Sequence, residues 1–153
     1  MRVLDSRQDA WRQLRALLQG QALAVLATSH EGHPYCSLIA FVVSDDLRTI
    51  LFGTSRNTRK FANITSDPRV SVLIDSRGNT DADFHQACAA TAVGREVKLP
   101  EAEYRALRGK YLERHPHLRD FVASPTFELV ALRIETYYLV SRFQHVMELH
   151  LET

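Results

Sequence analysis

The stretch ILFGTSRNTRK, residues 50–60, joins an apolar segment to three cations within five residues, Arg56, Arg59 and Lys60. A strand is expected to end here and a short helix to follow, near residues 58–65. The amino end of a helix carries partial positive charge and free N–H groups, so clustered cations there are repelled unless an anion is bound. The pattern fits a phosphate site with added Thr and Ser hydroxyls. It fits a solvated basic turn equally well.

Short apolar segments separated by turn residues lie on both sides of this stretch, as in a meander of antiparallel strands. Residues 38–43 are continuously apolar, which predicts a strand buried on both faces. Six or so strands with two or three peripheral helices predict a mainly β fold, a small β-barrel. The predicted strands span residues 22–28, 35–44, 49–54, 69–75, 87–97 and 127–140, with a short closing segment at 145–151.

Two helical regions are expected outside the strands. Residues 1–20 contain a capping-box pattern followed by apolar residues on one helical face, including Trp11 as a core anchor. Residues 100–124 form a helical insertion that begins after Pro100, a residue tolerated at the start of a helix. Its predicted buried stripe is Tyr104, Leu107 and Tyr111. No repeat or linker divides the chain, so residues 1–153 are expected to form a single domain.

Composition excludes several classes of protein. The 19 Lys and Arg residues nearly balance the 18 Asp and Glu residues, which argues against a general nucleic-acid binder. A membrane-spanning helix needs about 18 consecutive apolar residues, and no stretch of the sequence approaches that length. The start of the sequence lacks the apolar run of a signal peptide. Cys36 and Cys88 are far apart and indicate neither a disulfide framework nor a zinc site. The expected location is the cytoplasm.

Catalytic and metal-binding patterns are also weak. The histidines at 30, 33, 115 and 117 flank turns and lack metal-ligand spacing, so we expect surface histidines and no metal site. Ser37 has no recognisable acid–base partner nearby, and no catalytic residue is identified. Cys88 is interpreted as a small core residue. The composition of residues 76–83 predicts a polar loop, although Asp81, Asp83 and His85 could form an acid–base cluster.

The sequence resembles the pyridoxamine 5′-phosphate oxidase-like, FMN-binding split-barrel superfamily. The resemblance runs from about residue 22 to 94 and more weakly to the C-terminus. It is carried by ILFGT at 50–54, TRK at 58–60 and DPRVSVL at 67–73, with the turn EGHPY at 31–35 upstream. It implies a six-stranded antiparallel split barrel that forms a homodimer, with two flavins in clefts between the subunits.

The resemblance also implies roles for individual residues. The phosphate of FMN would be held by Arg59 and Lys60, with Thr54 and Thr58 beside it. The backbone of residues 36–38 and the Ser37 hydroxyl would line the flavin edge. The C-terminal region would reach the cleft, often from the partner subunit. The candidate cofactor-binding residues are Cys36, Ser37, Leu38, Thr54, Thr58, Arg59, Lys60, Arg142 and Gln144.

The sequence departs from the oxidase where that enzyme binds the phosphate of its substrate. Cys36 and Phe41 stand where the oxidase has an Arg and a substrate-binding Lys, and Val146 replaces a further cation. We therefore expect an uncharged or aromatic substrate, unless Arg77 or Arg133 supplies the missing charge. The loop over residues 75–85 is longer than in the oxidase and could reshape the pocket.

The function expected from the resemblance is an FMN-dependent oxidoreductase of unknown substrate, in which the flavin supplies the redox chemistry. Three alternatives stay open at this point. The chain could be a flavin-binding redox module without turnover. It could be a reductase that uses the deazaflavin F420 in the same cleft. It could also be a haem-handling protein on the same fold, with His85 or His145 as an axial ligand.

Overall fold

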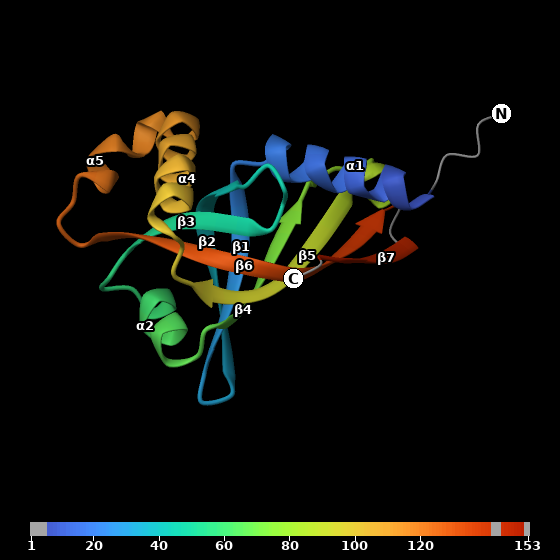
Figure 1. Cartoon of the computed structure of the whole chain (residues 1–153). Coiled ribbons are helices and arrows are strands. Elements are labelled where there is room, and N and C mark those ends of the chain that lie inside the picture. The colour runs from blue at the N-terminus through green and yellow to red at the C-terminus, as the bar shows by residue number, and fades with distance from the viewer. Residues whose placement is uncertain (1–5, 142–144, 152–153) are drawn as a thin grey trace.

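The computed structural model describes residues 6–141 and 145–151, which form an antiparallel sheet closed into a barrel (Figure 1). Six strands close it in the order β3-β2-β1-β4-β5-β6, because β3 also pairs with β6. A seventh strand, β7 (His145–His150), pairs with the C-terminal part of β6. The predicted mainly β, six-stranded antiparallel barrel is confirmed. The barrel strands are β1 Leu23–His30, β2 His33–Val43, β3 Thr49–Ser55, β4 Arg69–Asp75, β5 Cys88–Val97 and β6 Phe127–Ser141.

The helices lie on the outside of the barrel (Figure 1). Helix α1 packs against β2, β4 and β5, and α4 packs against β2 and β3. Helix α2 follows β3 and is anchored to β1 by the Asn63 amide, which donates to the Thr28 hydroxyl over 3.1 Å. None of the described helices has the length and apolar character needed to cross a membrane. The helices are α1 Ser6–Gly20, α2 Arg59–Ser66, α3 Asp83–Gln86, α4 Glu101–Arg114 and α5 Arg119–Val122, with a 3-10 turn at Pro116–Leu118.

Two apolar cores hold these elements together. The larger fills the barrel and extends under α1, where the half-buried Trp11 packs against it. The smaller lies outside the barrel, where α4 covers Val42 of β2 and Leu51 of β3. This second core explains why β2 is apolar on both faces near Val42. The expectation of full burial is wrong for Leu38, which is 63% exposed.

Two expectations for the insertion at residues 100–124 are also wrong. Tyr104 is exposed, whereas Leu107 and Tyr111 are buried as predicted. His115 is 2% exposed rather than a surface residue. Its Nε2–H donates to the carbonyl of Phe41 over 2.9 Å, and its ring lies 4.9 Å from that of Tyr111. The histidine therefore belongs to the contact between the insertion and β2.

Cationic side chains at the end of α4 also fix the insertion to the barrel. Lys110 donates to the carbonyl of Val43 over 2.9 Å, and Arg114 donates to the carbonyl of Gln21. Together with His115, these side chains bind two backbone carbonyls of β2 and one carbonyl just before β1. These contacts hold α4 and the turn after it above the junction of β2, β3 and α2, where the predicted site lies.

Candidate functional site

A cavity of about 250 Å³ lies where β2, the end of β3, the start of α2 and the insertion meet. We name it the junction cavity. It contains four of the predicted cofactor-binding residues and three residues of the insertion, so segments far apart in the sequence form one site. The residues used below are Leu38, Thr54, Thr58, Lys60, Tyr111 and Phe121.

Two threonine hydroxyls organise the floor of the junction cavity. Thr58 is the N-cap of α2, and its Oγ1 accepts the amide N–H of Phe61 over 3.3 Å. The same oxygen lies 2.9 Å from Oγ1 of Thr54 at the end of β3. The hydroxyl of Thr58 also donates to the carbonyl of Ser55 over 2.9 Å. The turn between strand and helix is therefore fixed with its two hydroxyls beside the positive end of α2.

Lys60 brings a cation into the junction cavity. Its side chain is half-buried, and no described residue forms an ion pair or hydrogen bond with its ammonium group. Burial lowers the pKa of Lys60, and no carboxylate opposes that effect. A half-buried cation without a counter-ion is an unfavourable arrangement that an anionic ligand would relieve.

The other two cations of the turn have different surroundings. Arg56 donates to the carbonyl of Pro125 over 2.8 Å and to Glu128 over 3.2 Å, so it fixes the turn to β6. Arg59 is exposed, and its guanidinium lies 5.8 Å from the ring centre of Tyr35. It lines a neighbouring cavity of about 430 Å³ that shares Thr58 with the junction cavity. The structure thus places Arg59 and Lys60 on two sides of Thr58.

Tyr111 is a site residue that the sequence reading missed. Its side chain is fully buried and lines the junction cavity, yet its hydroxyl has no hydrogen-bond partner among the described residues. Burial raises the pKa of the Tyr111 phenol, and the backbone of Gly53, which lies nearby without the geometry of a hydrogen bond, opposes that shift. A Cβ at Gly53 would lie 2.7 Å from the phenol oxygen, so glycine makes room for it. Buried hydroxyls without partners are rare, and this one suits a ligand in the cavity.

The three predicted residues of β2 are placed differently. Leu38 is exposed and lines the junction cavity. The Ser37 hydroxyl is buried without a described partner, on the side of the strand that pairs with buried Leu26. Cys36 is exposed and does not line the junction cavity. Arg142 and Gln144 lie outside the described residues, as does the side chain of His145.

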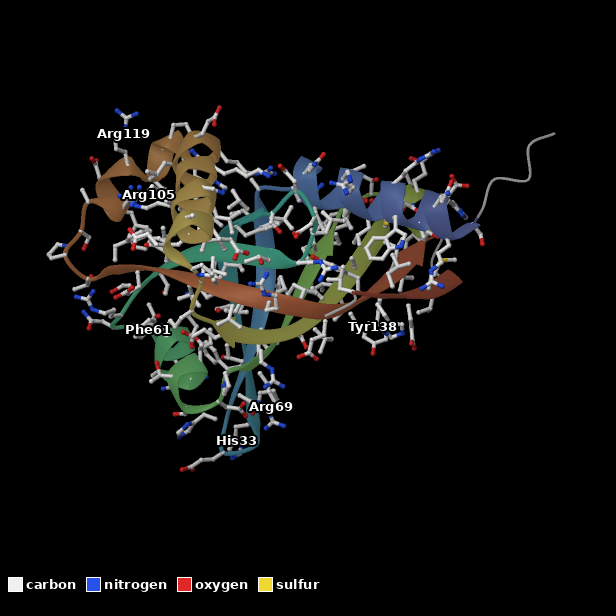
Figure 2. The ribbon with its side chains drawn as sticks, in the orientation of Figure 1. His33, Phe61, Arg69, Arg105, Arg119 and Tyr138 are labelled. Atoms are coloured by element: carbon white, nitrogen blue, oxygen red, sulfur yellow. The ribbon has the colours of Figure 1, made fainter. Side chains whose placement is uncertain are left out.

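The DPR segment at residues 67–69, part of the family resemblance, forms a local ion pair. The guanidinium of Arg69 donates to the Asp67 carboxylate over 3.0 and 2.9 Å, away from the junction cavity. These hydrogen bonds lower the pKa of Asp67 to about 2. Figure 2 shows Arg69 near the β1–β2 hairpin, with His33 at the hairpin tip. Exposed His30 and His33 agree with the expectation of surface histidines.

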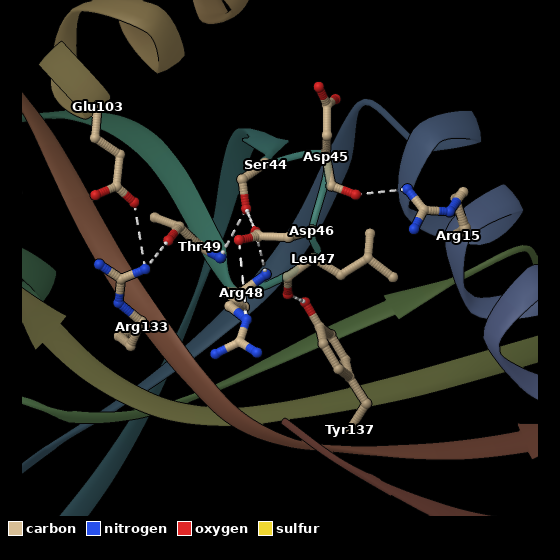
Figure 3. Close-up of polar contacts among 10 residues, drawn as sticks. All are labelled: Arg15, Ser44, Asp45, Asp46, Leu47, Arg48, Thr49, Glu103, Arg133 and Tyr137. Carbon is tan, nitrogen blue, oxygen red and sulfur yellow. Dashed lines mark hydrogen bonds and ion pairs between the residues drawn. The ribbon is translucent and has the colours of Figure 1, made fainter. Parts of the chain in front are cut away.

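The cations suggested as replacements for a second phosphate site are already paired. Arg77 lies 3.1 Å from the Asp75 carboxylate. Arg133 donates to the Thr49 hydroxyl over 2.8 Å and to Glu103 over 3.3 Å (Figure 3). Phe41 is fully buried in the barrel core. These positions leave no unpaired cation for a second phosphate.

The junction cavity fits part of a phosphorylated cofactor. Free amides of the first turn of α2, two hydroxyls and the Lys60 ammonium are the groups that bind phosphate in proteins. The volume of the junction cavity is smaller than that of complete small-molecule sites, which is about 300–1,000 Å³. A whole cofactor therefore needs binding surface beyond this cavity. Among residues 6–141 and 145–151, no three His, Cys, Asp or Glu side chains are grouped as metal ligands.

Solved structures with a similar fold bind different cofactors. A heme binding protein from Mycobacterium smegmatis is 17% identical, with a TM-score of 0.81, over 98% of this chain and 60% of that one. A FAD-binding protein from Mesorhizobium loti is 20% identical, with a TM-score of 0.68, over 84% and 90% of the two chains. The heme storage protein HutZ from Vibrio cholerae is 20% identical, with a TM-score of 0.67, over 85% and 92%. These likenesses show the fold alone.

Sequence comparison gives a more specific result. No curated protein matches this chain. The model of the family described as pyridoxamine 5′-phosphate oxidase matches residues 10–141, which include the whole closed barrel and the junction cavity. The chain belongs to the pyridoxamine 5′-phosphate oxidase family, with the split-barrel fold of that superfamily.

Proposed function

We propose that this chain binds FMN, with the phosphate in the junction cavity, and acts as a flavin-dependent oxidoreductase. The observation that carries the proposal is the ammonium of Lys60, half-buried without a counter-ion beside the N-terminus of α2. A phosphate there would interact with the helix amides, the Thr54 and Thr58 hydroxyls and Lys60 together. Arg59 could reach the same phosphate from the other side of Thr58 after leaving the Tyr35 ring.

The residues around the cavity have roles in binding and orientation rather than in covalent chemistry. Bound FMN supplies hydride or single-electron transfer, so the chain needs no nucleophile of its own. The exposed side chains of Leu38 and Phe121 offer apolar surfaces at the cavity. The Tyr111 hydroxyl is a hydrogen-bond donor available to the ligand. The FAD-binding neighbour from Mesorhizobium loti supports a flavin on this fold.

A homodimer is part of this proposal. Leu38 of β2 and Leu73 of β4 both pair with Val25 of β1, one from each side. With Leu23 they form an exposed apolar surface on the outer face of the sheet, at 63%, 36% and 53% exposure respectively. Contiguous apolar patches of this kind mark interfaces. A second copy placed there would cover the patch and enlarge the incomplete junction cavity.

The proposed substrate lacks a phosphate group of its own. A phosphorylated substrate beside FMN needs cations beyond those that bind the cofactor. Arg77 and Arg133 are paired with Asp75 and Glu103, and Phe41 is buried. Incubation with pyridoxamine 5′-phosphate in air, with peroxide and aldehyde measured, should give no turnover. Turnover at about 1 s⁻¹ or faster, within the ordinary range of enzymes, would contradict the proposal that the substrate lacks a phosphate.

The test of the cofactor is the absorption spectrum of the purified full chain, followed by titration with FMN. A flavin band, or saturable uptake of added FMN, is the expected result. Reduction of the bound flavin by NADH or NADPH would support turnover over a redox module. A haem spectrum without FMN uptake would overturn the proposal in favour of the chemistry of the Mycobacterium smegmatis neighbour. Binding of F420 but not FMN would assign the cleft to the deazaflavin.

A further inference from the structure

The chain contains three lysines, and their amines have different surroundings. Lys98 has an exposed side chain, and its ammonium lies 2.9 Å from the Glu96 carboxylate. Lys110 donates to the Asp45 carboxylate over 2.9 Å. Among the residues that the structure describes, Lys60 is therefore the one lysine whose amine has neither an ion pair nor a hydrogen bond.

The surroundings of Lys60 favour the neutral form of its amine. The side chain is half-buried in the junction cavity, and burial lowers the pKa of Lys60. The Glu96 carboxylate has the opposite effect and raises the pKa of Lys98. A neutral amine has a free electron pair and is a nucleophile, whereas an ammonium ion is not. At a given pH, a larger fraction of Lys60 than of Lys98 is therefore nucleophilic.

The junction cavity also contains a proton donor without an acceptor. The Tyr111 hydroxyl is buried, lines the same cavity as Lys60, and has no hydrogen-bond partner among the described residues. Burial raises the pKa of Tyr111, so the phenol keeps its proton at neutral pH. A phenol that donates to the carbonyl oxygen of a ligand makes the carbonyl carbon more electrophilic. The cavity therefore combines a nucleophilic amine with a hydroxyl that can polarise a carbonyl group.

The walls of the junction cavity favour a small aromatic ligand. Leu118 and Phe121 of the insertion line it, and neither belongs to the apolar surface proposed above as the dimer interface. The ring of Phe121 contacts that of Phe127 edge to face, with the ring centres 5.1 Å apart, so its position is fixed by packing. Aromatic rings pack favourably against such side chains. The volume of about 250 Å³ has room for a single ring with a short substituent.

We propose that the Lys60 amine forms a reversible imine with small aromatic aldehydes that enter the junction cavity. The Lys60 nitrogen attacks the aldehyde carbon while the Tyr111 phenol donates a hydrogen bond to the carbonyl oxygen. The two protons of the neutral amine pass to that oxygen, which leaves as water, and a carbon–nitrogen double bond forms. No oxidant or reductant is needed. Imine formation does not rest on the proposed flavin function, although the aldehyde and the FMN phosphate would compete for the same cavity.

The test is reductive trapping of the full chain with benzaldehyde and cyanoborohydride, followed by peptide mass spectrometry. The reductant converts each imine to a stable benzylamine, so the label on each lysine can be measured. At neutral pH, Lys60 should gain about fivefold or more label than Lys98 or Lys110. As the pH is lowered, labelling of Lys98 should fall before labelling of Lys60. Formaldehyde, which needs no apolar wall, is the positive control and should methylate all three lysines.

Two variants separate the reactive amine from its charge and from its neighbour. Lys60→Arg keeps the positive charge but cannot form an imine, so the label at this position should disappear while Lys98 and Lys110 are labelled as before. Tyr111→Phe should reduce labelling of Lys60 about threefold or more and leave the other two lysines unchanged. Equal labelling of the three lysines, no label on Lys60, or unchanged labelling in Tyr111→Phe would overturn the proposal.

Saturating FMN distinguishes this proposal from the proposed cofactor site. If the FMN phosphate occupies the junction cavity, FMN should reduce the label on Lys60 and leave that on Lys98 unchanged. Label on Lys60 that FMN does not reduce would support imine formation and contradict the phosphate assignment. Absence of label on Lys60 without FMN would overturn imine formation alone, because FMN binding is measured separately by titration.

Discussion

The hydroxyl oxygens of Thr54 and Thr58 lie 2.9 Å apart and join the end of β3 to the N-cap of α2. The same contact therefore supports the fold and shapes the proposed phosphate site. Thr58→Val removes the cap and should lower the free energy of unfolding by about 1 kcal/mol. In a domain of this size that corresponds to a fall in Tm of about 2–4 °C, measured by thermal unfolding.

The Thr58→Ser variant is the matched control, because serine keeps the capping oxygen. It should retain the Tm of the parent chain and the additional stabilisation that saturating FMN provides. Thr58→Val should lose part of that stabilisation as well as the cap. An unchanged Tm in the valine variant would show that Thr58 does not stabilise α2.

Removal of the Tyr111 hydroxyl should affect stability and binding in opposite directions. The hydroxyl is buried without a partner, so Tyr111→Phe should raise the free energy of unfolding of the ligand-free chain by about 1 kcal/mol. If the hydroxyl donates to FMN, the same variant should bind FMN about fivefold to tenfold more weakly. Urea unfolding and FMN titration measure the two effects separately.

Tyr137→Phe is the contrasting variant. The Tyr137 hydroxyl donates to the carbonyl of Leu47 over 2.6 Å inside the barrel (Figure 3). Its removal leaves that carbonyl unsatisfied and should lower the free energy of unfolding by about 1–3 kcal/mol.

The Tyr111 prediction has a clear contrary outcome. Destabilisation by Tyr111→Phe with unchanged FMN affinity would assign Tyr111 to the core alone.

The apolar outer face of the sheet predicts a homodimer. A charge placed on such a surface cannot be buried without a partner, so Leu23→Glu should separate the copies. Light scattering coupled to size-exclusion chromatography should give about twice the chain mass of 17.4 kDa for the parent and the single-chain mass for the variant. Tyr104→Glu, an exposed position on α4, should leave the dimer intact. A monomeric parent chain at micromolar concentration would contradict the prediction.

His115 should make stability depend on pH between about 7.5 and 5.5. Burial lowers the pKa of His115, so the unfolded chain, with an ordinary value of about 6.5, takes up the proton first as pH falls. The contribution of buried, neutral His115 to the free energy of unfolding is therefore fully present at about pH 7.5 and decreases as pH falls, by at most about 1.4 kcal/mol per pH unit. Urea midpoints measured at both ends of this window give the slope.

The variant His115→Gln retains a donor for the Phe41 carbonyl but cannot be protonated. Its slope should be shallower than that of the parent chain. His117 is the control, since it is an exposed neighbour whose ring lies 6.2 Å from that of His115. His117→Gln should leave the slope unchanged, and a parent chain with no slope would contradict the role of buried His115.

The sequence predicted the strands well because their apolar residues and turn signals are local. The strand predicted at residues 69–75 has the same bounds as β4, and residues 87–97 differ from β5 by one residue. The sequence could not show that α4 covers Val42 and leaves Leu38 exposed. That difference depends on where the insertion docks, which is a property of the folded chain.

The site was predicted in its parts but not in its arrangement. The resemblance to the family identified Thr54, Thr58 and Lys60 as site residues, and the junction cavity brings them together. It could not separate Lys60 from Arg59, because neighbouring helix residues point in different directions. Tyr111 was interpreted as a core residue, since an apolar stripe does not reveal whether a hydroxyl finds a partner. Its position opposite Gly53 arises only from tertiary packing.

The measurement that tests the central claim most directly is the FMN dissociation constant of two charge variants from one turn. Lys60→Gln removes the cation of the junction cavity, whereas Arg56→Gln removes a cation already bound to Pro125 and Glu128. Fluorescence titration should show affinity about tenfold or more weaker for Lys60→Gln and changed by no more than about twofold for Arg56→Gln. Replacing Arg59 and Lys60 together by alanine should weaken binding about 100-fold. Equal affinities of the parent chain and Lys60→Gln would contradict the account.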